Sequence, residues 1–120
     1  MTKTRRSNPD FLNGVPELLL LQLLARQPMY GYELVQAIKR ASGSKLVFGE
    51  GCIYPILHRL ERDDLLSSRR DDVHGRSRIT YRLTTKGQRQ LAASASVWKE
   101  VVSAVNQILQ GAADAQPSMA

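Results

Sequence analysis

The sequence has few of the residues from which disulfide frameworks, metal centres and active sites are built. Its only cysteine, Cys52, excludes an intrachain disulfide and fits a reducing cytoplasm. Two histidines and no glycine-rich phosphate loop give neither metal-ligand spacing nor a nucleophile-and-base pair, so neither an enzyme nor a bound cofactor is expected. No apolar run approaches the roughly 20 residues of a transmembrane helix, and no secretion signal follows the N-terminal cations.

Positive charge is what the sequence has in excess. Lys and Arg number 17 against 11 Asp and Glu, which gives a net charge of +6 and an isoelectric point near 9.9. Such a balance favours a polyanionic partner, although charge alone does not distinguish nucleic acid from an anionic membrane surface. A length of 120 residues predicts one domain with an appended helix.

The N-terminal part of the chain predicts a polar arm followed by two helices. Residues 1–10 carry three cations and are expected to form a flexible arm. Pro16 suits the first turn of a helix that continues to about Arg26 and is apolar on most sides, which suggests that a second chain covers part of it. A second helix is expected over residues 32–41, with Gly43 as a left-handed cap.

The stretch of residues 49–61 predicts the helix around which the chain is organised. One edge is apolar at helical spacing and should dock on a core. The other edge is aromatic, polar and basic, which suits the major groove of DNA. Pro55 is expected in the first turn, where a missing N–H is tolerated. The core-facing residues are Ile53, Ile56, Leu57 and Leu60, and the exposed ones are Tyr54, Pro55, His58, Arg59 and Arg62.

The pattern then changes to a period of two, which predicts a β-hairpin. Strands are expected over residues 65–70 and 78–83, with Gly75 in the turn between them. Residues 59–89 hold nine of the 17 cations, and this concentration favours a DNA-binding wing over a merely solvated face. The wing cations are Arg69, Arg70, Arg76, Arg78 and Arg82.

A long C-terminal helix is expected over residues 85–110, with Thr84 as its cap. Apolar residues at heptad positions make a long stripe on this helix, which predicts dimerisation, although folding back onto its own domain would also bury it. Residues 111–120 are expected to be disordered. The seam residues assigned to the dimer are Leu91, Val101, Val105 and Ile108.

Together these segments resemble the PadR-type winged-helix transcriptional regulators, in the short form with one C-terminal helix. The resemblance rests on Gly31-Tyr-Glu33, on residues 51–61, on Gly75-Arg76, and on Tyr81-Arg-Leu-Thr84 with Lys86-Gly87. It implies a homodimeric repressor that a small ligand or stress signal releases from DNA. Three positions depart from the family pattern: Cys52 replaces Thr, Ile56 replaces Ala, and Thr80 replaces the first Tyr of a pair.

Candidate DNA-contacting residues follow from the exposed edge and the wing. Each has a structural alternative, such as packing for Tyr32 and Tyr54, or an ion pair with Glu50 or Glu61 for His58 or Arg59. The wing arginines are expected to supply affinity more than sequence information. The residues expected to contact DNA are Tyr32, Tyr54, Pro55, His58, Arg59, Arg62, Arg76 and Arg78.

Trp98 is the only tryptophan and falls on the seam of the C-terminal helix. In multidrug-binding members that this sequence resembles, a tryptophan at the matching place stacks on flat ligands between subunits. Trp98 is therefore a candidate site for a planar or cationic effector, with simple interface packing as the alternative. Cys52 would have a lowered pKa at a helix N-terminus, but a small packing residue is the more ordinary role.

The sequence thus predicts a mostly α (α+β) winged helix-turn-helix domain over residues 11–84 with a C-terminal dimerisation helix. The expected function is DNA-binding transcriptional regulation, with double-stranded DNA and a second copy of the chain as partners. A winged-helix adaptor that binds proteins and no DNA is the alternative, and direct drug scavenging is a third.

Overall fold

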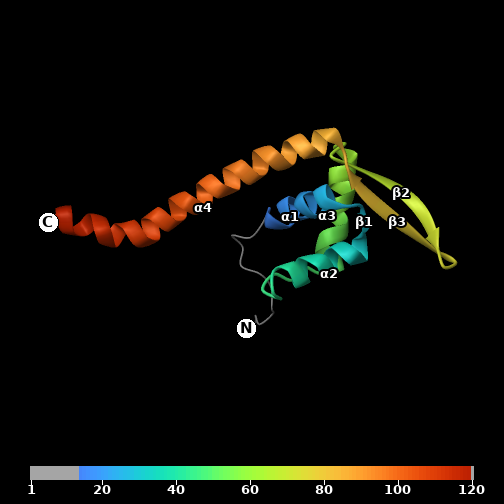
Figure 1. Ribbon diagram of the computed structural model, residues 1–120, viewed down its shortest axis with the longest axis horizontal. Coiled ribbons are helices and arrows are strands. Elements are labelled where there is room, and N and C mark those ends of the chain that lie inside the picture. Colours follow the sequence, from blue (N-terminus) through green and yellow to red (C-terminus); the bar gives the residue numbers. More distant parts are fainter. Residues whose placement is uncertain (1–13, 120) are drawn as a thin grey trace.

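The structure is a computed structural model that describes residues 14–119, with side chains described through Gly111. The expected N-terminal arm, residues 1–10, lies outside the described residues. The fold is mostly α with one small antiparallel sheet, as predicted (Figure 1). Its elements in chain order are α1 (Val15–Arg26), β1 (Met29–Tyr30), α2 (Gly31–Ala41), α3 (Glu50–Arg62), β2 (Leu66–Val73), β3 (Arg76–Leu83) and α4 (Thr85–Met119).

Helices α1, α2 and α3 share one apolar core at the base of the sheet. The predicted edge of α3 is buried, since Ile53, Leu57 and Leu60 are each 0% exposed. Each such side chain stabilises the fold by about 1.5–3 kcal/mol relative to an exposed one. The nearly all-round apolar α1 is mostly covered within its own chain, and the half-buried Leu18 and Leu19 are what a second chain could still cover. Its buried residues are Val15, Pro16, Leu20, Leu21, Leu23 and Leu24.

The sheet has the strand order β1-β3-β2. The two-residue β1 was not predicted, because it forms only by pairing Met29 with Tyr81 and Tyr30 with Thr80. The hairpin strands are also longer than predicted, and a two-residue turn joins them. Both turn residues are left-handed, with φ 51° at His74 and 76° at Gly75, as type I′ hairpin turns require.

Pro55 lies further into α3 than predicted. The helix starts at Glu50, where the Gly49 carbonyl accepts hydrogen bonds from the N–H groups of Cys52 and Ile53, both at 3.0 Å. Pro55 is therefore inside the helix, and the expectation of a first-turn proline is wrong. The missing N–H removes one intrahelical bond, and the buried apolar edge of α3 offsets that loss.

Helix α4 begins at the foot of the hairpin and projects well beyond the domain (Figure 1). The Thr84 hydroxyl accepts a hydrogen bond from the Gly87 N–H at 2.9 Å, so the predicted cap is present. The helix continues past Gly111, where sequence analysis expected disorder. A glycine inside a helix costs only about 1 kcal/mol relative to alanine, so it does not by itself end one.

Gly87 is expected to be essential for seating α4. A Cβ at this position would lie 2.2 Å from the Leu65 carbonyl oxygen and 2.6 Å from Leu83 Cδ1. Gly87→Ala should therefore lower the free energy of unfolding by about 1–3 kcal/mol, measured by urea denaturation. Gly111→Ala is the matched control, because no atom lies within 4 Å of its added Cβ. An unchanged stability of Gly87→Ala would contradict this account.

Candidate nucleic-acid interface

The face of α3 opposite the core is accessible, with Pro55, His58 and Arg62 all exposed. Tyr54 is half-buried. Its ring lies directly on the backbone of Gly31 at the start of α2. An added Cβ at Gly31 would stand 2.4 Å from the Tyr54 ring. Burial, followed by the nearby Glu50 and Tyr30, raises the pKa of Tyr54. Tyr54 therefore joins α2 to α3 while it borders the accessible face.

Arg59 is directed to α1. Its Nη2 donates to Glu17 Oε1 at 2.7 Å, in an ion pair whose side chains are 45% and 27% exposed. Sequence analysis considered Glu50 and Glu61 as partners, but Glu61 instead accepts a hydrogen bond from the Ser68 hydroxyl at 2.5 Å. The Arg59–Glu17 pair joins α1 to α3, and a surface pair of this kind contributes at most about 1 kcal/mol.

The wing carries its cations on and around the hairpin. Arg69 Nε lies 3.2 Å from Asp71 Oδ1. A hydrogen bond from the Thr80 side chain is the main cause of the lowered pKa of Asp71, with Arg69 and Arg82 adding to it. Arg76 is exposed beside the turn. Thr80 stands where the family pattern has a tyrosine, and in this chain its side chain bonds to Asp71.

Two tyrosines lie where α2 begins. Tyr32 is 50% exposed, as a phosphate-contacting residue at a helix start would be. Tyr30 was not singled out from the sequence. The Arg78 guanidinium lies over its ring, 4.4 Å from the centroid, which is within the range of a cation–π contact. Only the sheet register, in which Tyr30 pairs with Thr80, brings these two side chains together.

Cys52, for which packing was the more ordinary expectation, is exposed in the first turn of α3. Partial burial raises its pKa, which corrects the expectation of a lowered pKa at the helix N-terminus. Within the described residues, no group of three or more His, Cys, Asp and Glu side chains is placed to hold a metal ion. Among the same residues, no helix is both long and apolar enough to cross a membrane.

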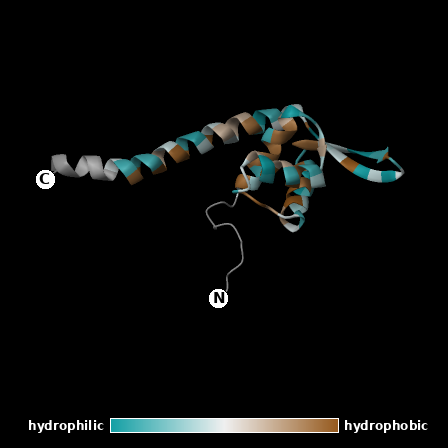
Figure 2. Cartoon of the chain, turned by 60° about the horizontal axis from the view of Figure 1, so that its bottom comes forward, coloured by the Kyte–Doolittle hydropathy of each residue, from teal (hydrophilic) through white to brown (hydrophobic). Residues whose placement is uncertain are grey.

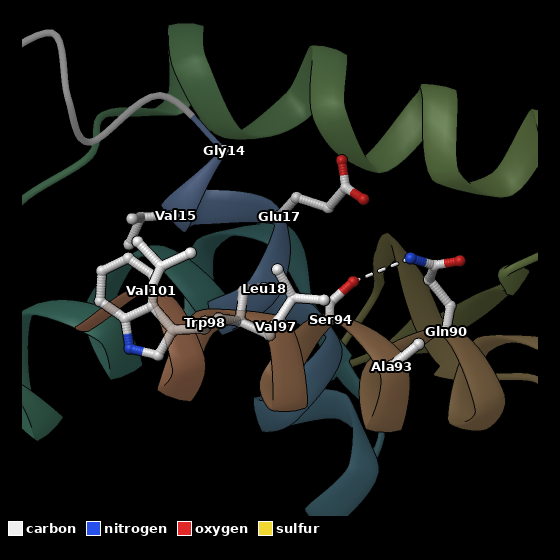
Figure 3. Close-up of a pocket in the computed structure, with 10 residues that line it drawn as sticks. All are labelled: Gly14, Val15, Glu17, Leu18, Gln90, Ala93, Ser94, Val97, Trp98 and Val101. Atoms are coloured by element: carbon white, nitrogen blue, oxygen red, sulfur yellow. Dashed lines mark hydrogen bonds between the residues drawn. The ribbon is translucent and has the colours of Figure 1, made fainter. Parts of the chain in front are cut away.

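A groove of about 340 Å³ lies between the start of α1 and the middle of α4 (Figure 3). Trp98 is 42% exposed in it, with the side chains of Val15 and Val101 beside the indole (Figure 3). The Glu17 carboxylate belongs to the same lining and turns toward α3, where it meets Arg59. The lining residues are Gly14, Val15, Glu17, Leu18, Gln90, Ala93, Ser94, Val97, Trp98 and Val101.

The seam residues predicted for α4 fall into two groups. Leu91 is half-buried and packs against the core of its own chain. Further along, apolar residues recur on the projecting part of the helix (Figure 2). Val101, Val105 and Ile108 are 48%, 47% and 71% exposed, so the monomer leaves this surface uncovered.

Comparison with known proteins agrees with this architecture. The family described as "Transcriptional regulator PadR-like family" matches residues 20–93, which is more than half of the chain. The chain belongs to the PadR-like family of transcriptional regulators. A transcriptional regulator of Mycobacterium tuberculosis, Rv3488, is 33% identical over 96 residues, which cover 80% of this chain and 87% of that protein.

Solved PadR-like structures share the fold over most of their length. A PadR family transcriptional regulator from Eggerthella lenta has a TM-score of 0.74 at 30% identity, over 83% of this chain and 86% of that chain. A PadR-like transcriptional regulator from Bacillus cereus has a TM-score of 0.73 at 31% identity, over 85% and 98% of the two chains. The winged-helix prediction and the family resemblance are therefore confirmed.

Sequence reasoning about this PadR-like chain missed three residues of the candidate interface. Glu17 and Tyr30 were not singled out from the sequence. Gly31 was noted as part of a motif, without its contact to Tyr54. Each gains its role from a residue at least 20 positions away, such as Arg59 or Arg78, so local patterns carry little signal for it.

Proposed function

We propose that this protein is a homodimeric DNA-binding repressor that acts in the cytoplasm. The observation that carries the proposal is the accessible face of α3, in a PadR-like domain whose hairpin adds a cluster of arginines. The opposite edge of the helix is held in the core, so the polar face is presented on a rigid support. A helix of this kind inserts into the major groove of DNA, where base edges are distinguishable.

The proposed DNA contacts divide into two kinds. His58 and Arg62, with Pro55 beside them, are positioned to meet base edges. The wing arginines and Tyr32 contact DNA phosphates and so fix the orientation of the domain on the duplex. Arg59 adds positive charge near the DNA. Its guanidinium lies on the side of α3 that faces α1, because it is paired with Glu17.

The proposed dimer forms through α4. Val97, Trp98, Val101, Val105 and Ile108 are large apolar residues left exposed on a helix that projects from its domain. A second α4 packed along this stripe would remove it from water, and apolar burial is the dominant favourable term in association. In a two-fold dimer, the two copies of α3 would meet half-sites about one helical turn apart.

The proposed effector is a planar aromatic cation bound in the groove beside Trp98. The indole offers a flat face for stacking, and Glu17 offers a carboxylate at the rim. The same carboxylate pairs with Arg59, so Glu17 both lines the groove and contacts α3. An effector that binds one dimer geometry more tightly would shift the population toward it and away from operator binding.

Binding to DNA should be strongly salt-dependent. A duplex from upstream of the protein's own coding sequence should bind more tightly than a random duplex of equal length. Affinity for both should fall by about a thousandfold or more between 50 and 200 mM salt if six to ten phosphates are contacted. Arg62→Gln should reduce the preference for the upstream duplex, whereas Lys99→Gln on α4 removes equal charge and should not. Salt-independent or absent DNA binding would favour a protein-binding adaptor instead.

Exposed apolar residues of α4 should be required for dimerisation. Val105→Asp and Ile108→Asp place a carboxylate in the seam and should shift sedimentation from dimer to monomer. Both side chains are exposed in the single chain, so thermal unfolding of the monomer should change little. Ser103→Asp, on the opposite face of the same helix, is the matched control. A dimer that survives both seam variants would exclude α4 as the dimer interface.

Charge selectivity in the groove should depend on Glu17, and all binding on Trp98. We expect calorimetry to detect the cation 9-aminoacridine more readily than the uncharged, similarly shaped acridone. Glu17→Gln should weaken binding of the cation only, by about two- to fivefold, as expected for one exposed charge pair. Trp98→Ala should abolish both binding and the release of DNA by the cation. Unchanged ligand binding and DNA release in Trp98→Ala would contradict the proposed effector site.

A further inference from the structure

Tyr30 is held in place from two directions. As the last residue of β1 it pairs with Thr80 of β3, which makes β1 the third strand of the wing. Its N–H also donates to Glu33 Oε1 at 3.0 Å, where it precedes the first turn of α2. Tyr30 therefore ties the sheet to the start of a helix, and its backbone position is determined by both.

The Arg78 guanidinium lies over the Tyr30 ring. Arg78 precedes Thr80 by two residues, so it shares a sheet face with Tyr30 as a diagonal cross-strand neighbour. The 4.4 Å from Cζ to the ring centroid is short for a cation–π pair, for which contacts extend to about 6 Å. This arrangement fixes a long side chain that would otherwise sample many rotamers.

No carboxylate neutralises Arg78 within the part of the chain that the structure describes. Asp71 is its direct partner across the hairpin, but Asp71 is engaged by Arg69 and by the Thr80 side chain. The guanidinium therefore keeps its charge and its in-plane N–H donors for another anion. The Tyr30 ring is not a conventional hydrogen-bond acceptor, so the N–H donors of the guanidinium remain available to an anion.

This arginine lies near the accessible face of α3. Tyr30 is close enough to Tyr54 to contribute to the raised pKa of that phenol. Tyr54 in turn rests on Gly31, the residue after Tyr30. Tyr30 is thus placed where the wing, the first turn of α2 and the N-terminal half of α3 meet.

We propose that Tyr30 is a positioning residue that holds the Arg78 guanidinium at this corner to receive a DNA phosphate. The inference rests on the proposed DNA-binding function and adds a residue to it. The phosphate contact would be charge-assisted and independent of base sequence. Tyr30 itself need not touch DNA. Its role is to restrict the rotamers of Arg78 in the free protein, so that Arg78 loses less conformational entropy when it binds.

The test is a double-mutant cycle, with duplex binding measured by fluorescence anisotropy on the full-length protein. The probes are the upstream duplex and a random duplex of equal length. Tyr30→Leu should weaken binding to both by about two- to fivefold, whereas Tyr30→Phe, which keeps the ring, should bind like the unsubstituted protein. Arg78→Gln should weaken binding and reduce the slope of log affinity against log salt by about one phosphate contact.

The combined variant distinguishes positioning from a general structural effect. In an Arg78→Gln background, Tyr30→Leu should cost little further affinity, because the side chain it positions is gone. An equal loss in both backgrounds would overturn the proposal. Pentafluorophenylalanine at position 30 keeps the ring shape and withdraws the negative charge from its face. It should weaken binding like leucine while the melting temperature is retained, and normal binding by this folded variant would also overturn the proposal.

The same measurements separate this inference from the function on which it rests. If the unsubstituted protein fails to bind either duplex, the proposed function is wrong and Tyr30 has no phosphate contact to support. If it binds with the expected salt dependence and the Tyr30 variants bind equally well, the function stands and the positioning role is wrong.

Discussion

Burial of one edge of α3 is the constraint on which the rest of the molecule depends. Ile53, Leu57 and Leu60 lie in a core shared with α1 and α2, and their burial fixes the rotation of α3 about its own axis. Because successive helical residues point about 100° apart, fixing this edge decides which side chains face outward. It also allows Pro55 inside the helix, since core packing compensates for a missing hydrogen bond. The accessible polar face is therefore a consequence of the packing.

Polar contacts then set the angle of the wing and of α4 relative to α3. The Ser68 hydroxyl donates to Glu61, so β2 is fixed to the helix whose face lies beside it. At the same end of the hairpin, where β3 leads into α4, the Thr84 hydroxyl donates to the carbonyls of Asp64 and Leu65 and caps α4. These contacts join elements adjacent in sequence through a short, rigid corner.

The molecule places its uncovered apolar surface away from its cationic one. Polar and charged groups gather on α3 and the hairpin, whereas large exposed apolar residues gather on α4 (Figure 2). A groove beside Trp98 lies between the start of α1 and α4, and its Glu17 pairs with Arg59. Such an exposed pair contributes at most about 1 kcal/mol, so it joins α1 to α3 only weakly.

The sequence by itself determined the elements whose signals are local. Apolar spacing identified the buried edge of α3, alternation with Gly75 identified the hairpin, and family motifs supplied the winged-helix architecture. Tertiary structure alone decided the partner of Arg59, the cation–π contact of Arg78 with Tyr30, and the strand β1. It also packs Leu91 against the core of its own chain. The reason is physical: spacing along a helix or strand fixes which side a residue faces, but only the packing of distant elements fixes what it meets there.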